Sequence, residues 1–157
     1  MVGIVHKRKW VKSSSEKFSS YINYIDREEA VRNYKLDEYS LFNDYMGNPK
    51  KCGNLFTSDR DFLSEDESKK LKRCFSIAQE NGSFMWQDVF SFDNEWLEKY
   101  GMYDRRTGAL DEKRLMEAVR NSMTEMIERE NFDSLIWSAS MHFNTDNIHI
   151  HIASVEL

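Results

Sequence analysis

The sequence predicts one α+β domain in which helices flank a mainly antiparallel sheet. Apolar and polar residues alternate in several short segments, which is typical of strands, and apolar residues recur at helical spacing in others. The 157 residues are enough for one domain with a substantial core. One proline, six glycines and no repeat or linker-like stretch argue against a domain boundary.

The first half of the chain begins with a predicted strand at Val2–Val11, which starts apolar and then alternates. A helix is expected from about Ser15 to Glu29, because the three serines before Glu16 can cap it. The apolar side of this helix recurs at i, i+3, i+4 and i+7: Phe18, Tyr21, Ile22 and Ile25. Residues 33–63 are polar and irregular, and we expect short elements and loops there.

The middle of the chain predicts helices at Ser64–Glu80, Asp93–Tyr100 and Asp111–Glu130, with a strand at Phe84–Phe92 before the second helix. Asn81-Gly82 would end the first of these helices. The last helix has the clearest apolar stripe, which predicts packing against a sheet. Its members are Leu115, Met116, Val119, Met123, Met126 and Ile127.

The last segments, Leu135–Phe143 and Ile148–Val155, are predicted to be two strands of a hairpin. The four residues between them, Asn144 to Asn147, have the composition of a tight loop.

Three of the four histidines lie in this hairpin: His142, His149 and His151. Side chains alternate along a strand, so His149 and His151 share a face, and a four-residue loop places His142 opposite His149. A lone histidine in a strand is usually structural, but three on one face, with isoleucines between them, favour a metal site. Three imidazoles leave coordination positions open, which is typical of a catalytic centre.

The charges are unevenly distributed. The net charge is −5, which is unusual for a protein that binds nucleic acid. The first twelve residues nevertheless hold four cations and no carboxylate, whereas no lysine or arginine occurs from Asn131 to Leu157. If the histidine segment handles a phosphodiester, a bound metal is the natural source of positive charge. Lys7, Arg8, Lys9 and Trp10 are candidates to hold single-stranded DNA by charge and stacking, with a solvated strand edge as the alternative.

No apolar run is long enough to span a bilayer, and charged residues stand where a secretory signal would be apolar. We therefore expect a cytoplasmic protein without membrane insertion.

The segment from His142 to His151 resembles motif III of conjugative relaxases, the HxDxxNxHxH signature of the HUH superfamily. It is most similar to the MobP-like classes, including the MobL relaxases. Asn147 and the apolar spacers match, while Asn144 replaces the aspartate of many members. Both asparagines are expected to support the histidine ligands from outside the coordination sphere.

The family's nucleophilic tyrosine lies on a helix after the first strand, and the segment from Phe18 to Ile25 is similar to that motif. The motif alignment places Tyr24 at the nucleophile. Helical spacing also puts Tyr21 on the apolar stripe and Tyr24 at its margin. Tyr24 is therefore the expected nucleophile, and Tyr21 remains an alternative or a second hydroxyl.

The resemblance implies an HUH relaxase-like fold and site-specific nicking of one strand at an origin of transfer. It implies a Mg²⁺ or Mn²⁺ cofactor held by the three histidines, although imidazoles also suit Zn²⁺ or Ni²⁺. Origin DNA, accessory relaxosome proteins and a coupling protein are the implied partners. Because relaxases of this kind continue past motif III, we expect these residues to be an N-terminal fragment of a longer protein.

Three alternatives are weaker. Replication initiators and transposases of the superfamily place their tyrosine after the histidine strand, whereas every tyrosine here precedes it. A cupin-like enzyme for small molecules would need more glycine turns than six glycines supply. A non-catalytic, metal-stabilised interaction module is the third.

Overall fold

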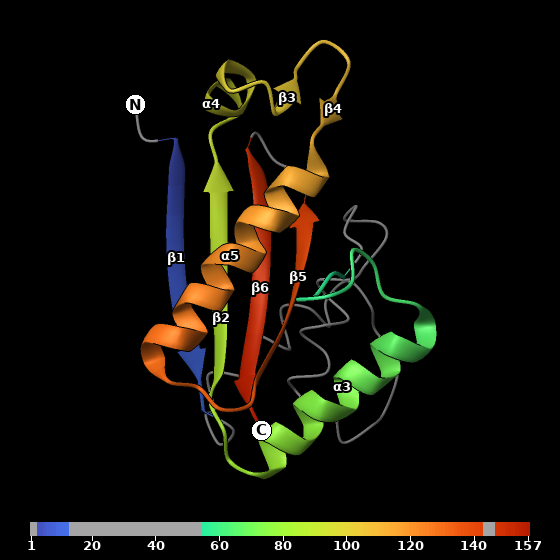
Figure 1. The fold of residues 1–157 in the computed structure, drawn as a ribbon, viewed down its shortest axis with the longest axis vertical. Coiled ribbons are helices and arrows are strands. Elements are labelled where there is room, and N and C mark those ends of the chain that lie inside the picture. Colours follow the sequence, from blue (N-terminus) through green and yellow to red (C-terminus); the bar gives the residue numbers. More distant parts are fainter. Residues whose placement is uncertain (1–2, 13–54, 143–146) are drawn as a thin grey trace, which may run out of the picture.

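The computed structural model describes residues 3–12, 55–142 and 147–157. In this part of the chain, four antiparallel strands form a sheet in the order β1-β2-β6-β5, with helices around it (Figure 1). The strands are β1 Ile4–Val11, β2 Met85–Phe92, β5 Leu135–His142 and β6 Ile148–Glu156. The α+β prediction is confirmed.

The described helices are α3 Glu65–Glu80, α4 Asn94–Lys99 and α5 Glu112–Glu130. Each begins after a residue whose side chain accepts a hydrogen bond from a main-chain N–H of the first turn, so that a terminal donor is satisfied. These capping residues are Ser64, Asp93 and Asp111. The predicted bounds of all three helices are correct to within one or two residues.

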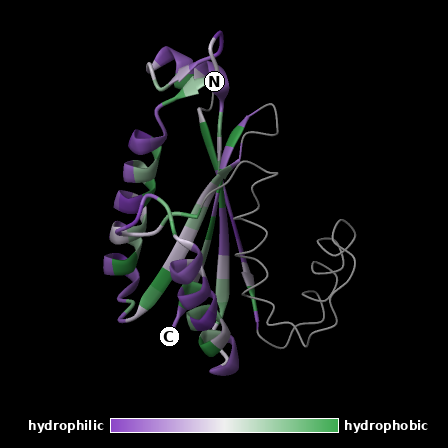
Figure 2. Cartoon of the chain, turned by 90° about the vertical axis from the view of Figure 1, so that its right-hand side faces the viewer, coloured by the Kyte–Doolittle hydropathy of each residue, from purple (hydrophilic) through white to green (hydrophobic). Residues whose placement is uncertain are grey.

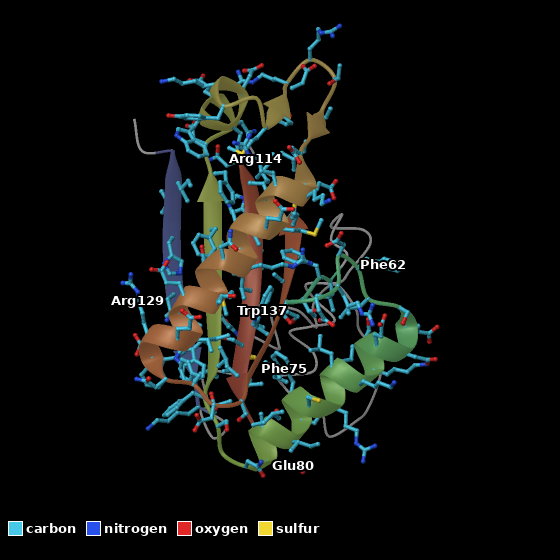
Figure 3. All side chains as sticks on the ribbon, viewed as in Figure 1. Phe62, Phe75, Glu80, Arg114, Arg129 and Trp137 are labelled. Atoms are coloured by element: carbon cyan, nitrogen blue, oxygen red, sulfur yellow. The ribbon has the colours of Figure 1, made fainter. Side chains whose placement is uncertain are left out.

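Helix α5 crosses one face of the sheet diagonally (Figure 1). Its buried residues Leu115, Val119 and Met123 pack in one cluster with Trp137 of β5 and the isoleucines of β6. Figure 3 shows Trp137 between α5 and the strands, and Figure 2 shows hydrophobic and hydrophilic residues alternating along α5. The apolar stripe predicted from the sequence is the side of the helix that faces the core.

Helix α3 packs against the opposite face, at the end where β6 finishes. Phe75, which is labelled in Figure 3, and Ala78 of α3 are buried against Met85, Ala153 and Val155. The histidines lie on this same face, nearer the other end of β6.

A small hairpin of β3 Tyr103–Asp104 and β4 Ala109–Leu110 was not predicted, because two-residue strands carry no periodicity. Turn chemistry builds it instead: Asp104 accepts hydrogen bonds from the main-chain N–H groups of the turn, and Gly108 has a φ of 72°. The helix predicted at Ser15–Glu29, residues 33–54 of the predicted loops and most of the histidine loop lie outside the described residues.

Candidate active site

The hairpin of β5 and β6 brings the three candidate ligands together. His142 pairs directly with His149, as the loop length predicted. The ring centroids of His142 and His151 are 4.6 Å apart, and those of His149 and His151 are 6.4 Å apart. Ile148, Ile150 and Ile152 are buried in the α5 core on the other face. The predicted sharing of one face is confirmed.

The imidazoles make local contacts that orient them. His149 Nδ1 lies 2.5 Å from the carbonyl oxygen of Asn147, so a neutral His149 that donates there has its lone pair on Nε2. The buried His142 has its Nε2 3.0 Å from the hydroxyl of Ser140. Asn147 thus acts on a histidine through its main chain, and Ser140 is a contact that the sequence did not indicate.

The nitrogens themselves do not converge: within the described residues, no three histidine, cysteine or carboxylate side chains form a ready set of metal ligands. Two imidazoles bound to one cation with tetrahedral geometry, at metal–nitrogen distances of about 2.0–2.1 Å, have ring centroids roughly 5.3 Å apart. The separation of His142 and His151 is shorter than this and that of His149 and His151 is longer. For the three histidines to bind one ion, the His149 ring must therefore move toward His151.

Strand β1 divides the four residues predicted to bind DNA between the two faces of the sheet. Lys7 pairs with Val89, and Val89 pairs with His151, so Lys7 and Lys9 face the same side as the histidines. Two strand spacings separate β1 from β6, or roughly 10 Å. Arg8 and Trp10 point to the α5 side. The structure therefore brings two of the four residues to the histidine face.

Arg8 has a partner on the α5 side that the sequence did not reveal. Its guanidinium bonds both carboxylate oxygens of Asp88, at 2.7 and 3.1 Å, and His6 Nε2 lies 2.6 Å from the same carboxylate. Asp88 is only 1% exposed. A buried carboxylate needs such partners, because desolvation of an unpaired charge is costly. The sequence offered one indication of this ion pair: Asp88 is the single charged residue of β2, which lies opposite a basic strand.

Residues at the start of α4 make hydrogen bonds with the chain at the end of the sheet where the histidines lie. Asn94 Oδ1 accepts a hydrogen bond from the main-chain N–H of Ile148 at 3.2 Å, beside His149. The N–H of Asp93 donates to the carbonyl of Gly3 at 2.9 Å. A Cβ at Gly3 would lie 2.2 Å from the ring of Trp96, so only glycine fits there. Asn94 is thus a second residue near the site that the motif comparison missed.

The predicted nucleophiles Tyr21 and Tyr24, together with Asn144, lie outside the described residues. Of the helices that the structure describes, none combines the length and apolar character needed to cross a membrane.

A mainly antiparallel four-stranded sheet, flanked by helices and bearing three histidines on one face, is compatible with an HUH relaxase-like fold. The family model of the MobL relaxases matches residues 1–157, the whole chain. The chain therefore belongs to the MobL relaxase family. This membership sets aside the replication-initiator and transposase alternatives.

Among curated proteins, the chain is similar to the uncharacterized protein R530 of Acanthamoeba polyphaga mimivirus, with 33% identity over 51 residues. The match covers 32% of this chain and 10% of the viral protein. No solved structure matches.

Proposed function

We propose that this protein nicks one DNA strand at an origin of transfer by metal-assisted attack of Tyr24. The observation that carries the proposal is that three imidazoles share one face of the β5–β6 hairpin, in a chain that belongs to a relaxase family. Membership supports the class of enzyme and its binding of origin DNA. The nicking chemistry, the metal and the residue roles are our proposal.

His142, His149 and His151 are the residues that would hold a divalent cation. Such a cation polarises a phosphate and offsets its negative charge. The resemblance favours Mg²⁺ or Mn²⁺, and the imidazole donors also suit Zn²⁺ or Ni²⁺. The Asn147 carbonyl and the Ser140 hydroxyl then fix ring orientations, as contacts outside the coordination sphere do in many metal sites.

Tyr24 is the proposed nucleophile, on the motif from Phe18 to Ile25. Its hydroxyl gives up a proton and attacks the scissile phosphorus in line. The bond from phosphorus to the 3′ oxygen breaks, and that oxygen takes a proton to become a free 3′-hydroxyl. The 5′ side stays on the enzyme as a phosphotyrosine, which conserves the phosphodiester for later rejoining. We further propose that accessory relaxosome proteins and a coupling protein act with the enzyme.

Lys7 and Lys9 are proposed to bind the phosphates of the same strand, because they face the histidine side. Phosphate contacts dominate the affinity of such proteins and make it depend on salt. Arg8 is assigned instead to the buried carboxylate of Asp88.

The test is covalent adduct formation with labelled single-stranded oligonucleotides that tile the transfer origin of the parent element, with Mn²⁺ and with chelator. We expect a metal-dependent adduct in the wild type and none in Tyr24→Phe, which loses one oxygen and keeps the ring. Tyr21→Phe is the matched control and should retain the adduct. A full adduct yield from Tyr24→Phe would contradict the assignment, and a metal-independent adduct would contradict the role of the histidines.

A further inference from the structure

An exposed group of aromatic rings lies on the α5 side of the sheet, at the end of β1 away from the histidines. Trp10 is 60% exposed and Phe84 is 39% exposed. The ring centroids of Trp10 and Phe84 are 5.5 Å apart, in an edge-to-face contact. Those of Phe84 and Trp86 are 6.3 Å apart, and those of Trp86 and Phe132 are 5.2 Å apart. We call these four residues the aromatic platform. Its connected rings hold the Trp10 indole in place while leaving most of it in solvent.

The charges beside the platform are asymmetric. Lys12 Nζ lies 5.7 Å from the centre of the Phe84 ring, and the segment from Ile4 to Lys12 contains four cations and no carboxylate. The described carboxylates at this end of the molecule include those of the last turns of α5, Asp133, Glu156 at the end of β6 and Glu80 at the end of α3. A ligand that is both anionic and flat is therefore favoured along β1 and disfavoured along α5.

Among the strands that the structure describes, β1 lies at one edge of the sheet, so its two faces meet there. Lys9 points to the histidine side of that edge, and the next residue, Trp10, points to the other side. On the opposite margin of the sheet, β5 is bridged by Phe56. A strand of DNA that leaves the histidine face across β1 thus meets a lysine first and an indole next.

We propose that Trp10 stacks on a base of the bound DNA strand that lies outside the cleavage site, after the strand has crossed the β1 edge. This inference rests on the proposed function. Single-stranded DNA fits the surface because its phosphates suit the lysines and its bases suit an exposed indole. A surface tryptophan fixed by neighbouring rings loses little conformational entropy on stacking.

The distance makes the role of Trp10 specific. Lys7 is in the cross-strand row of His151, roughly 10 Å away, and Trp10 is three residues farther along β1, another 10 Å. The main chain at Trp10 is therefore about 14 Å from that at His151, too far to contact the scissile phosphate. Trp10 contributes to affinity and not to the rate of the chemical step.

The test uses fluorescence anisotropy with labelled oligothymidylates of increasing length, since stacking on an aromatic ring tolerates any base. Trp10→Ala should weaken the binding of long oligonucleotides by roughly 5- to 100-fold, the range expected for one stacked base. It should leave the shortest oligonucleotides that bind unaffected. Trp10→Phe should retain most of the affinity.

Phe62→Ala is the matched control, because Phe62 is 64% exposed and lies across the molecule from β1 (Figure 3). It should bind every oligonucleotide as the wild type does. A second measurement needs no variant: 2-aminopurine placed at successive positions of a long oligothymidylate should be quenched by the wild-type protein at a position near one end.

The outcomes distinguish a failure of the proposed function from a failure of the proposed Trp10 contact. If the wild type binds neither oligothymidylate nor origin strands, the proposed function fails. If the wild type binds and Trp10→Ala binds equally well at all lengths, the proposed function stands and the platform is not a DNA contact. If Trp10→Ala weakens the binding of the shortest oligonucleotides as much as that of the long ones, Trp10 is part of the cleavage site. The proposal that the DNA strand reaches Trp10 only after crossing the β1 edge is then wrong.

Discussion

Replacing Arg8 and Lys7 separately by methionine should produce opposite phenotypes, although the two residues are neighbours with the same charge. Arg8 pairs with the buried Asp88 on the α5 side, whereas Lys7 faces the histidine side. Methionine keeps an unbranched side chain of similar length and removes the charge. The first change should therefore affect stability, and the second should affect DNA binding.

The magnitude follows from burial. Removing one partner of a fully buried ion pair costs about 3–5 kcal/mol, and an exposed pair is worth at most about 1 kcal/mol. Asp88 is 1% exposed and Arg8 39%, and His6 remains beside the carboxylate when Arg8 is lost. We expect Arg8→Met to cost about 2–3 kcal/mol. A chain of this size loses about 2–4 °C of Tm per kcal/mol, which gives a fall of roughly 4–12 °C.

Lys7→Met should change the unfolding free energy by no more than about 0.5 kcal/mol, as for other surface substitutions. Its effect should appear in the salt dependence of binding to single-stranded DNA, where losing one phosphate contact lowers the slope by about 1. Thermal unfolding and anisotropy at several salt concentrations measure both quantities. The reasoning is refuted if Arg8→Met unfolds at the wild-type temperature, or if Arg8→Met reduces the salt slope and Lys7→Met does not.

Two further predictions concern the neighbours of the site and the cap of α3. Asn94→Ala removes the acceptor of the Ile148 N–H beside His149, so Mn²⁺ affinity measured by calorimetry should fall by about 10-fold. Asn94→Asp keeps an acceptor oxygen and should restore the Mn²⁺ affinity. An equal loss of Mn²⁺ affinity in both variants would contradict a positioning role for Asn94. Hydrogen bonds from the main-chain N–H and the hydroxyl of Ser64 lower the pKa of Glu67. The ionised Glu67 therefore stabilises the helix cap at pH values above the pKa of Glu67 in the unfolded chain. This stabilisation is lost as the pH falls through the pKa of Glu67 in the folded protein. Ser64→Ala should lower Tm at pH 7, and the difference should shrink toward pH 3; a constant difference would count against the capping box.

The histidine hairpin could be predicted from the sequence because every step in that argument is local. Four loop residues fix the register, and register with alternation decides which side chains share a face. The pairing of His142 with His149 then follows without any knowledge of the rest of the fold. The helices were equally accessible, since caps such as Ser64 and the stripe of α5 lie within their own segments.

The role of β1 could not be predicted, because it depends on pairing between residues about eighty positions apart. The basic segment reads as one cluster along the chain, but a strand sends successive side chains to opposite faces. Which face receives Lys7 and which receives Arg8 depends on the register with β2, and no turn connects the two strands to set it. Asp88 was missed for the same reason, since its partners come from the far end of the sequence.

The acidic net charge is compatible with the proposed chemistry once the charges are assigned to faces. Strands β2, β5 and β6 carry no lysine or arginine, so among the described strands the cations on the histidine face come from Lys7 and Lys9 of β1. The lysines and the arginine of α3 lie on this face toward the other end of β6. At roughly 10 Å Lys7 and Lys9 are beyond the Debye length of about 8 Å at physiological salt, and they screen a phosphate beside His151 only weakly. On the proposed function, they bind phosphates elsewhere on the DNA strand. On the proposed function, the charge that develops at the scissile phosphate is therefore stabilised by the cation on the three imidazoles. Affinity for DNA then depends on β1, whereas the chemical step depends on β5 and β6.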